Sequence, residues 1–176
     1  MSNHGYVKTK EFMSAKKILT LLHNLNQKHF KGNLQIEMFE PPKINQLAWW
    51  ELIYTGDDGK QYGYRQCWLN TQKSFEIRHG GGGDFVWWID CVISNEVAAQ
   101  FNGIITDDGC EDKIKGELPY KYASLNEFVN MMWNHVPKWY RSLFMRIMRK
   151  NFPPEFRSQK SHRKNSGNHD LKNFAK

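Results

Sequence analysis

The residues best suited to chemistry in this chain are two carboxylates that lie inside apolar stretches. Asp90 lies within FVWWIDCVI, and Glu51 lies within AWWELIY. Burial raises the pKa of a carboxyl group, which can then exchange a proton, unless a cationic partner keeps it charged. Candidate partners for Asp90 are Arg65, Arg78 and His79. If Asp90, Glu51 and His79 share a cleft, the chain is a small enzyme with an acid/base site. The alternative, which we favour, is that the carboxylates form structural ion pairs or lie on a strand edge that faces water.

The segment that follows Arg78 is a histidine and four glycines, His79 to Gly83. A His-Gly-Gly-Gly run forms part of the oxyanion hole in lipases and esterases, but that fold also needs a G-x-S-x-G nucleophile elbow. The chain has no such elbow, and the glycines fit no phosphate-loop pattern. We therefore expect an exposed hairpin loop in which His79, Gly81 and Gly82 contact a ligand or partner.

Metal and cofactor binding find no support in the sequence. The seven histidines and three cysteines lack the short spacings of a metal site, so no metal and no cofactor is expected. Cys67 and Cys91 are expected to be buried, inert thiols. The odd number of cysteines and the polar N-terminus favour a reducing, cytoplasmic location. No run of 18 apolar residues occurs, so no transmembrane segment is expected.

The positive charge of the chain is concentrated at its C-terminal end. The net charge is +7, and residues 138–176 hold eleven lysines and arginines against two acidic residues. Such a block attracts polyanions, although a solubilising tail would have the same composition. The candidate anion- or nucleic-acid-binding residues are Arg141, Arg149, Lys150, Arg157, Lys160, Arg163 and Lys164.

Two aromatic stretches, residues 46–55 and 61–69, predict a β-hairpin around Asp58 and Gly59. A type I′ turn at these two residues would fix the register. The facing pairs are then Trp49–Trp68, Ile53–Tyr64 and Thr55–Tyr62. Aromatic side chains therefore gather on one sheet face, while Arg65 lies on the other. We expect Trp49, Tyr64, Trp68 and Arg65 to contact a ligand or partner.

The N-terminal part of the chain is expected to support this hairpin with a helix. Residues 1–8 read as a loose lead-in. Apolar residues spaced three and four apart predict a helix from Thr9 to Lys31, with Thr9 as its N-cap and Gly32 ending it with positive φ. Alternation of apolar and polar residues predicts a strand that begins at Leu34.

The segment Phe85–Ser94 is apolar on both sides and is expected to be the central strand of the sheet. A hairpin that pairs Ala99 with Leu118 is expected next. Ser124 and Glu127 form a capping box that predicts a helix to Val136, and a second amphipathic helix is expected over residues 138–150. Residues 157–176 are polar and read as disordered.

Together these patterns predict an α+β fold: an N-terminal helix, an antiparallel meander of about six or seven strands, and two C-terminal helices packed on one sheet face. Residues 1–156 are expected to form a single domain and residues 157–176 a disordered basic tail. The favoured function is a non-catalytic intracellular interaction module, such as an immunity or adaptor protein, with another protein as partner. The alternatives are a nucleic-acid-associated protein that grips phosphates through residues 138–176, and the small enzyme described above.

Overall fold

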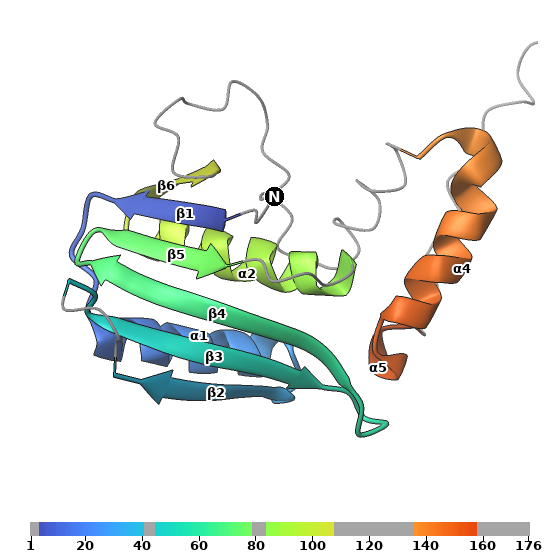
Figure 1. The fold of residues 1–176 in the computed structure, drawn as a ribbon, viewed down its shortest axis with the longest axis horizontal. Helices are drawn as coiled ribbons and strands as arrows, with labels where there is room; N and C mark the ends of the chain where they lie inside the picture. Colours follow the sequence, from blue (N-terminus) through green and yellow to red (C-terminus); the bar gives the residue numbers. More distant parts are fainter. Residues whose placement is uncertain (1–3, 41–44, 79–83, 108–135, 158–176) are drawn as a thin grey trace, which may run out of the picture.

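The computed structural model describes residues 4–40, 45–78, 84–107 and 136–157, and it has an α+β fold (Figure 1). The six strands of the described part form one antiparallel sheet in the order β2-β3-β4-β5-β1-β6. The strands are β1 (His4–Thr9), β2 (Leu34–Phe39), β3 (Ala48–Thr55), β4 (Gln61–Thr71), β5 (Ser74–Arg78) and β6 (Gly103–Asp107). Two helices, α1 (Ala15–His29) and α2 (Asp84–Gln100), cover one face of the sheet, and the core lies between the two layers (Figure 1).

The sheet is a meander only from β2 to β5. β1 pairs with β5 on one side and with β6 on the other, so the N-terminal strand lies between two strands that follow it in sequence. The expectation of a loose lead-in over residues 1–8 is therefore wrong for residues 4–8, and residues 1–3 lie outside the described part. Val7 is fully buried, but it is one apolar residue between polar neighbours, and so the short segment carried no clear alternation signal.

The N-terminal helix is shorter than the sequence predicts. α1 begins at Ala15, and its N-cap is Ser14, whose Oγ accepts a hydrogen bond from the Lys17 N–H at 3.3 Å. Thr9 instead lies in β1. The helix ends at His29, two residues before the expected Lys31. The positive φ expected at Gly32 is confirmed (+81°), and Lys31 before it also has positive φ (56°).

Asn26, on the buried side of α1, joins the helix to β2. Its Oδ1 accepts from the Leu34 N–H at 2.9 Å, and its Nδ2 donates to the Leu34 carbonyl at 2.7 Å. Leu34 and Asn26 are only 3% and 7% exposed, so water cannot replace these bonds easily. The Asn26 side chain thus bonds both backbone groups of Leu34, as a neighbouring strand would at this position.

Replacing Asn26 by alanine is expected to lower the free energy of unfolding by about 2–4 kcal/mol, because two buried backbone groups lose their partners. Urea denaturation followed by tryptophan fluorescence measures the change. Asn24→Ala is the matched control, since Asn24 is exposed on the same helix and should shift the value by no more than about 0.5 kcal/mol. Equal losses in the two variants would contradict the structural role given to Asn26.

The expectation of a central strand over Phe85–Ser94 is wrong, because this segment is the first part of helix α2. The expected burial is correct: Ile89, Cys91 and Ile93 are each no more than 1% exposed. A helix that is covered on nearly all sides loses the polar stripe that distinguishes it from a buried strand. The glycines before it suggested a hairpin, but the helix begins directly after them at Asp84.

The expected hairpin over residues 99–118 is also corrected in its first part. Ala99 lies in the last turn of α2, and the strand β6 begins only at Gly103. Residues 108–118 and the helix expected from Ser124 lie outside the described residues. No helix in the described part of the chain is long and apolar enough to cross a membrane.

The C-terminal residues of the described part form a 3-10 turn, η2 (Lys138–Tyr140), and the helices α4 (Arg141–Asn151) and α5 (Pro154–Arg157). The helix expected over residues 138–150 is thereby confirmed from Arg141 onward, whereas its first three residues form the 3-10 turn. Figure 1 shows α4 standing beside the sheet and α5 returning toward the turn between β3 and β4. Phe156 packs against Tyr54, which points to the helix-covered side of the sheet.

Candidate binding surface on the outer sheet face

The sheet face turned away from α1 and α2, here called the outer face, has a row of stacked side chains across four strands. The rings of Phe39 and Trp49 stack at a centroid distance of 4.7 Å, and those of Trp49 and Trp68 stack at 4.9 Å with only 9° between their planes. The guanidinium of Arg78 lies 4.5 Å from the Trp68 ring centroid. This aromatic ladder, Phe39–Trp49–Trp68–Arg78, runs from β2 to β5 and fixes each ring against its neighbour.

The register of the β3–β4 hairpin creates the centre of the aromatic ladder. Trp49 pairs with Trp68 and Ile53 with Tyr64, as the sequence predicts. The turn is different from the expected type I′, since Gly59 has positive φ (75°) but Asp58 does not. As a result Thr55 pairs with Gln61 rather than Tyr62.

Exposure along the aromatic ladder increases toward the sheet edge at β2. Trp68 is 5% exposed, Trp49 is half-buried, and Phe39 is 38% exposed. Glu76, which pairs with Trp68, is also buried and holds Arg78 at 3.0 Å. The accessible part of the outer face therefore lies over β2, β3 and the adjoining part of β4. Phe39 was not singled out from the sequence, because its partner Trp49 is separated from it by the Pro41-Pro42 connection.

A polar triad lies next to the aromatic ladder on the outer face. The Tyr64 hydroxyl donates to Glu51 Oε1 at 2.6 Å, and Gln66 Nε2 donates to the same carboxylate at 3.2 Å and to the Tyr64 oxygen at 2.8 Å. Partial burial and the bond to Glu51 raise the pKa of the Tyr64 hydroxyl. The phenol therefore stays protonated at neutral pH and presents a fixed, partly exposed ring.

Arg65 and Asp90 form an ion pair on the opposite, helix-covered side of the sheet. Arg65 Nε lies 2.7 Å from Asp90 Oδ1, with the two side chains 3% and 0% exposed. Arg65 also donates to the Tyr64 carbonyl at 3.0 Å. Of the three candidate partners of Asp90, Arg65 is the one that the structure shows bonded to its carboxylate. This position makes Arg65 a core residue and not part of the surface that carries Trp49 and Tyr64.

The two carboxylates considered for acid/base chemistry do not share a cleft. Glu51 bonds to Tyr64 on the outer face, whereas Asp90 bonds to Arg65 beneath the other face. Tyr64 and Arg65 are consecutive residues of β4, so their side chains point to opposite sides of the sheet. His79, Gly81 and Gly82 lie outside the described residues. The sheet itself thus separates Glu51 from Asp90.

The described residues contain no group of three His, Cys, Asp or Glu side chains that could hold a metal ion. Cys67 and Cys91 are free and buried, as expected from the sequence. Burial raises the pKa of both thiols, so they stay protonated and poorly reactive. Neither thiol lies at the outer face.

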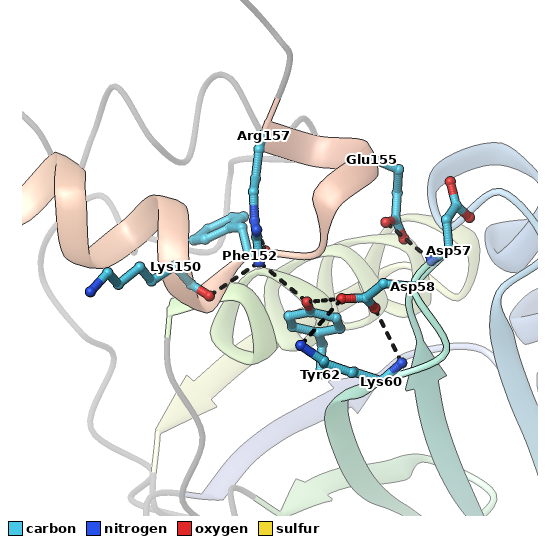
Figure 2. Close-up of polar contacts among 8 residues, drawn as sticks. All are labelled: Asp57, Asp58, Lys60, Tyr62, Lys150, Phe152, Glu155 and Arg157. Atoms are coloured by element: carbon cyan, nitrogen blue, oxygen red, sulfur yellow. Dashed lines mark hydrogen bonds and ion pairs between the residues drawn. The ribbon is translucent and has the colours of Figure 1, made fainter.

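A cluster of polar contacts fastens α5 to the turn between β3 and β4 (Figure 2). Glu155 accepts hydrogen bonds from the Tyr54 hydroxyl and from the Asp57 N–H. Burial, followed by the bond to Glu155, raises the pKa of Tyr54, so its hydroxyl remains a donor. Arg157 Nη2 donates to the Tyr62 hydroxyl at 3.2 Å, and Tyr62 in turn donates to Asp58 at 2.7 Å.

The structure separates the candidate anion-binding residues into two groups. Arg157 donates to the carbonyls of Phe152 and Lys150 as well as to Tyr62, and Arg141 donates to the Val136 carbonyl at 3.1 Å. Both arginines therefore stabilise the C-terminal segment. The side chain of Lys150 is exposed. The side chain of Arg149 and the residues Lys160, Arg163 and Lys164 lie outside the described part.

Comparison with known proteins gives no relative. No protein-family model matches the chain, and no curated protein or solved structure matches it significantly.

Proposed function

We propose that the chain is a non-catalytic binding module that recognises another protein through the accessible part of its outer face. The observation that carries the proposal is the aromatic ladder, which fixes Trp49 and Phe39 rigidly and leaves Phe39 38% exposed at the sheet edge. Rings that are already ordered lose little conformational entropy on binding, and aromatic residues dominate the energetics of protein interfaces. Tyr64, also 38% exposed, adds a polar contact on the same face.

The alternative of an enzyme receives less support from the geometry. Asp90 is held by Arg65 in the core, and Glu51 is held by Tyr64 and Gln66 on the outer face. Each carboxylate thus has a structural partner, and the two are separated by the sheet. The free, buried thiols of Cys67 and Cys91 agree with our proposal of a reducing, cytoplasmic location.

Affinity capture with matched surface variants tests the outer face. Full-length protein is used as bait in nuclease-treated lysate of the native host, and captured proteins are quantified by mass spectrometry. Phe39→Ala/Tyr64→Ala is expected to lower capture of the partner at least about tenfold, as the loss of two exposed aromatic anchors would. The control is Leu143→Ala/Ile147→Ala, which removes two exposed apolar side chains of α4 and should not alter capture. Loss in the control alone would place the interface on α4 and contradict the proposal.

A second candidate is binding of nucleic acid through residues 138–176, favoured by the exposure of Lys138, Arg146 and Lys150 around α4. Phosphate contacts by lysine and arginine produce an affinity that falls steeply with salt. The truncation that tests this candidate should end after Arg157, because Phe156 and Arg157 belong to the folded part.

If this second candidate is correct, the affinity for fluorescent single- or double-stranded DNA or RNA falls at least about tenfold between 50 and 200 mM salt. Lys138→Glu/Lys150→Glu and the truncation after Arg157 should each weaken binding. Salt-insensitive binding, or binding retained by both variants, would reject the candidate.

A further inference from the structure

Strand β2 forms one edge of the sheet (Figure 1). It pairs with β3 on one side, and no other described strand pairs with it. An edge strand presents backbone N–H and C=O groups that another extended chain can bind. The direction in which each residue of β2 points therefore decides what this edge can accept.

The hydrogen bonds at the start of β2 establish those directions. Asn33 accepts from the Thr55 N–H of β3 at 3.1 Å, whereas both backbone groups of Leu34 bond to Asn26 on the side away from β3. In an antiparallel strand, the backbone groups of successive residues point alternately toward one side of the strand and toward the other. The backbone N–H and C=O groups of Ile36 and Met38 therefore point outward from the sheet, as those of Leu34 do, but only those of Leu34 are bonded to Asn26.

The side chains along this edge differ between the two sheet faces. On the helix-covered side, Ile36 is half-buried and Met38 is 53% exposed. On the outer face, Glu37 is exposed and its carboxylate bonds to Gln35. Phe39 stacks one ring face on Trp49, so its other ring face is turned toward the open edge. The edge thus combines an apolar side with one negative charge and a free aromatic face.

A second copy of this chain fits the edge poorly. If Ile36 of one copy paired with Met38 of the other in antiparallel fashion, Glu37 would lie directly opposite Glu37 of the second copy. Like charges in facing positions are destabilising. A shift of the register by two residues in one direction would require the backbone groups of Leu34, which Asn26 already holds. A shift in the other direction would place Ile36 opposite Glu40, whose carbonyl already accepts a hydrogen bond from Trp49 Nε1 at 2.8 Å. The same features that disfavour self-pairing leave the edge open to a strand of a different sequence.

We propose that the β2 edge binds an antiparallel strand of the partner protein that places a lysine or arginine opposite Glu37. Directly opposed residues share a sheet face, so the partner residues opposite Met38 and Ile36 are apolar and extend the core side. The residue opposite Phe39 is an aromatic residue or arginine, which continues the aromatic ladder. From its N-terminus to its C-terminus, the partner strand therefore carries a planar side chain (aromatic or arginine), an apolar residue, a basic residue and a second apolar residue. This inference rests on the proposed function and specifies the form of its partner.

Amide hydrogen exchange of the free, full-length protein tests the directions of the backbone groups. Gln35 and Glu37 should exchange slowly because their N–H groups donate to β3, and Leu34 should be slow because it donates to Asn26. Ile36 and Met38 should exchange at least about tenfold faster than these neighbours. Equal protection of all five amides would mean that the edge is already covered, which overturns the inference and leaves the proposed function of the outer face intact.

A synthetic peptide tests the partner motif. The probe is acetyl-Ser-Trp-Val-Lys-Val-Thr-Ser-amide, added to ¹⁵N-labelled full-length protein. The largest chemical-shift changes are expected at the amides of Ile36 and Met38. A peptide with glutamate in place of lysine should bind about threefold to tenfold more weakly, because a favourable facing pair becomes a repulsive one.

The variant Glu37→Lys should reverse the preference between the lysine and glutamate peptides. Met38→Pro removes one outward N–H without touching the bonds to β3, and it should abolish binding of both peptides. If Met38→Pro fails to fold, the comparison of the two peptides on Glu37→Lys still tests the inference. Absence of shifts at Ile36 and Met38 at millimolar peptide, or the same preference in wild type and Glu37→Lys, overturns the inference. Loss of partner capture by Phe39→Ala/Tyr64→Ala together with such a result would retain the outer face as the interface without strand pairing.

Discussion

Replacing Asp90 by alanine is expected to lower the free energy of unfolding by about 3–5 kcal/mol, the cost of breaking a buried ion pair from one side. The Arg65 guanidinium would remain in the core, 3% exposed, without the carboxylate that now lies 2.7 Å from it. Both groups are essentially without contact to water, so solvent does not compensate the loss. Urea denaturation monitored by circular dichroism measures the change.

The double variant Arg65→Met/Asp90→Ala separates the ion pair from a simple loss of packing. It removes both charges, and so it should be at least as stable as Asp90→Ala alone. The matched control is Glu96→Ala on the same helix, which breaks the ion pair with Lys28 at 3.3 Å, where the side chains are 28% and 65% exposed. This exposed pair should contribute no more than about 1 kcal/mol. If the double variant loses as much unfolding free energy as Arg65→Met and Asp90→Ala lose together, the two side chains are not energetically coupled and the prediction is wrong.

Replacing Phe156 by alanine is expected to lower the free energy of unfolding by about 3 kcal/mol, as for other phenylalanines truncated in a core. Phe156 is 8% exposed, and its ring lies 5.4 Å from that of Phe85 and 5.5 Å from that of Trp88. α5 is only four residues long, so this packing, together with the contacts of Glu155 and Arg157, must hold it on the domain.

The control for this second prediction is Trp139→Ala. Trp139 is also an aromatic residue of the C-terminal segment, but it is 83% exposed, so its loss should change stability by no more than about 0.5 kcal/mol. Differential scanning calorimetry gives an independent measure, with a clearly lower Tm expected for Phe156→Ala alone. An unchanged Tm in both variants would show that α5 does not stabilise the domain.

Local patterns were sufficient for several parts of the fold. The β3–β4 hairpin follows from two adjacent aromatic strands and a short turn, and this gave the Trp49–Trp68 pair at the centre of the aromatic ladder. The helical stripe of α1 and the strand at Leu34 likewise appear in the spacing of neighbouring residues. In each case the interacting residues are close in sequence, so the pattern and the structure report the same contacts.

Other parts depend on contacts between distant segments. Phe85–Ser94 has a composition that fits a buried strand or a buried helix, and its packing between the sheet and the other helices selects the helix. β1 has too few apolar residues to be recognised alone, but β5 and β6 supply hydrogen-bonding partners on both of its sides. The sequence places Arg65 both among the expected binding residues and among the three candidate partners of Asp90, and only the position of α2 shows that it is the core partner of Asp90.

By itself, the sequence determined that this chain forms an α+β domain, that its aromatic hairpin has a Trp49–Trp68 register, and that its positive charge lies at the C-terminal end. The tertiary structure decided which side chains share a surface. Glu51 and Asp90 are separated by the sheet, and Phe39 joins the aromatic ladder across a chain connection that no local pattern predicts. The physical reason is that periodicity reports how a segment is buried, whereas the identity of the burying partner is set by packing between elements that are distant in sequence.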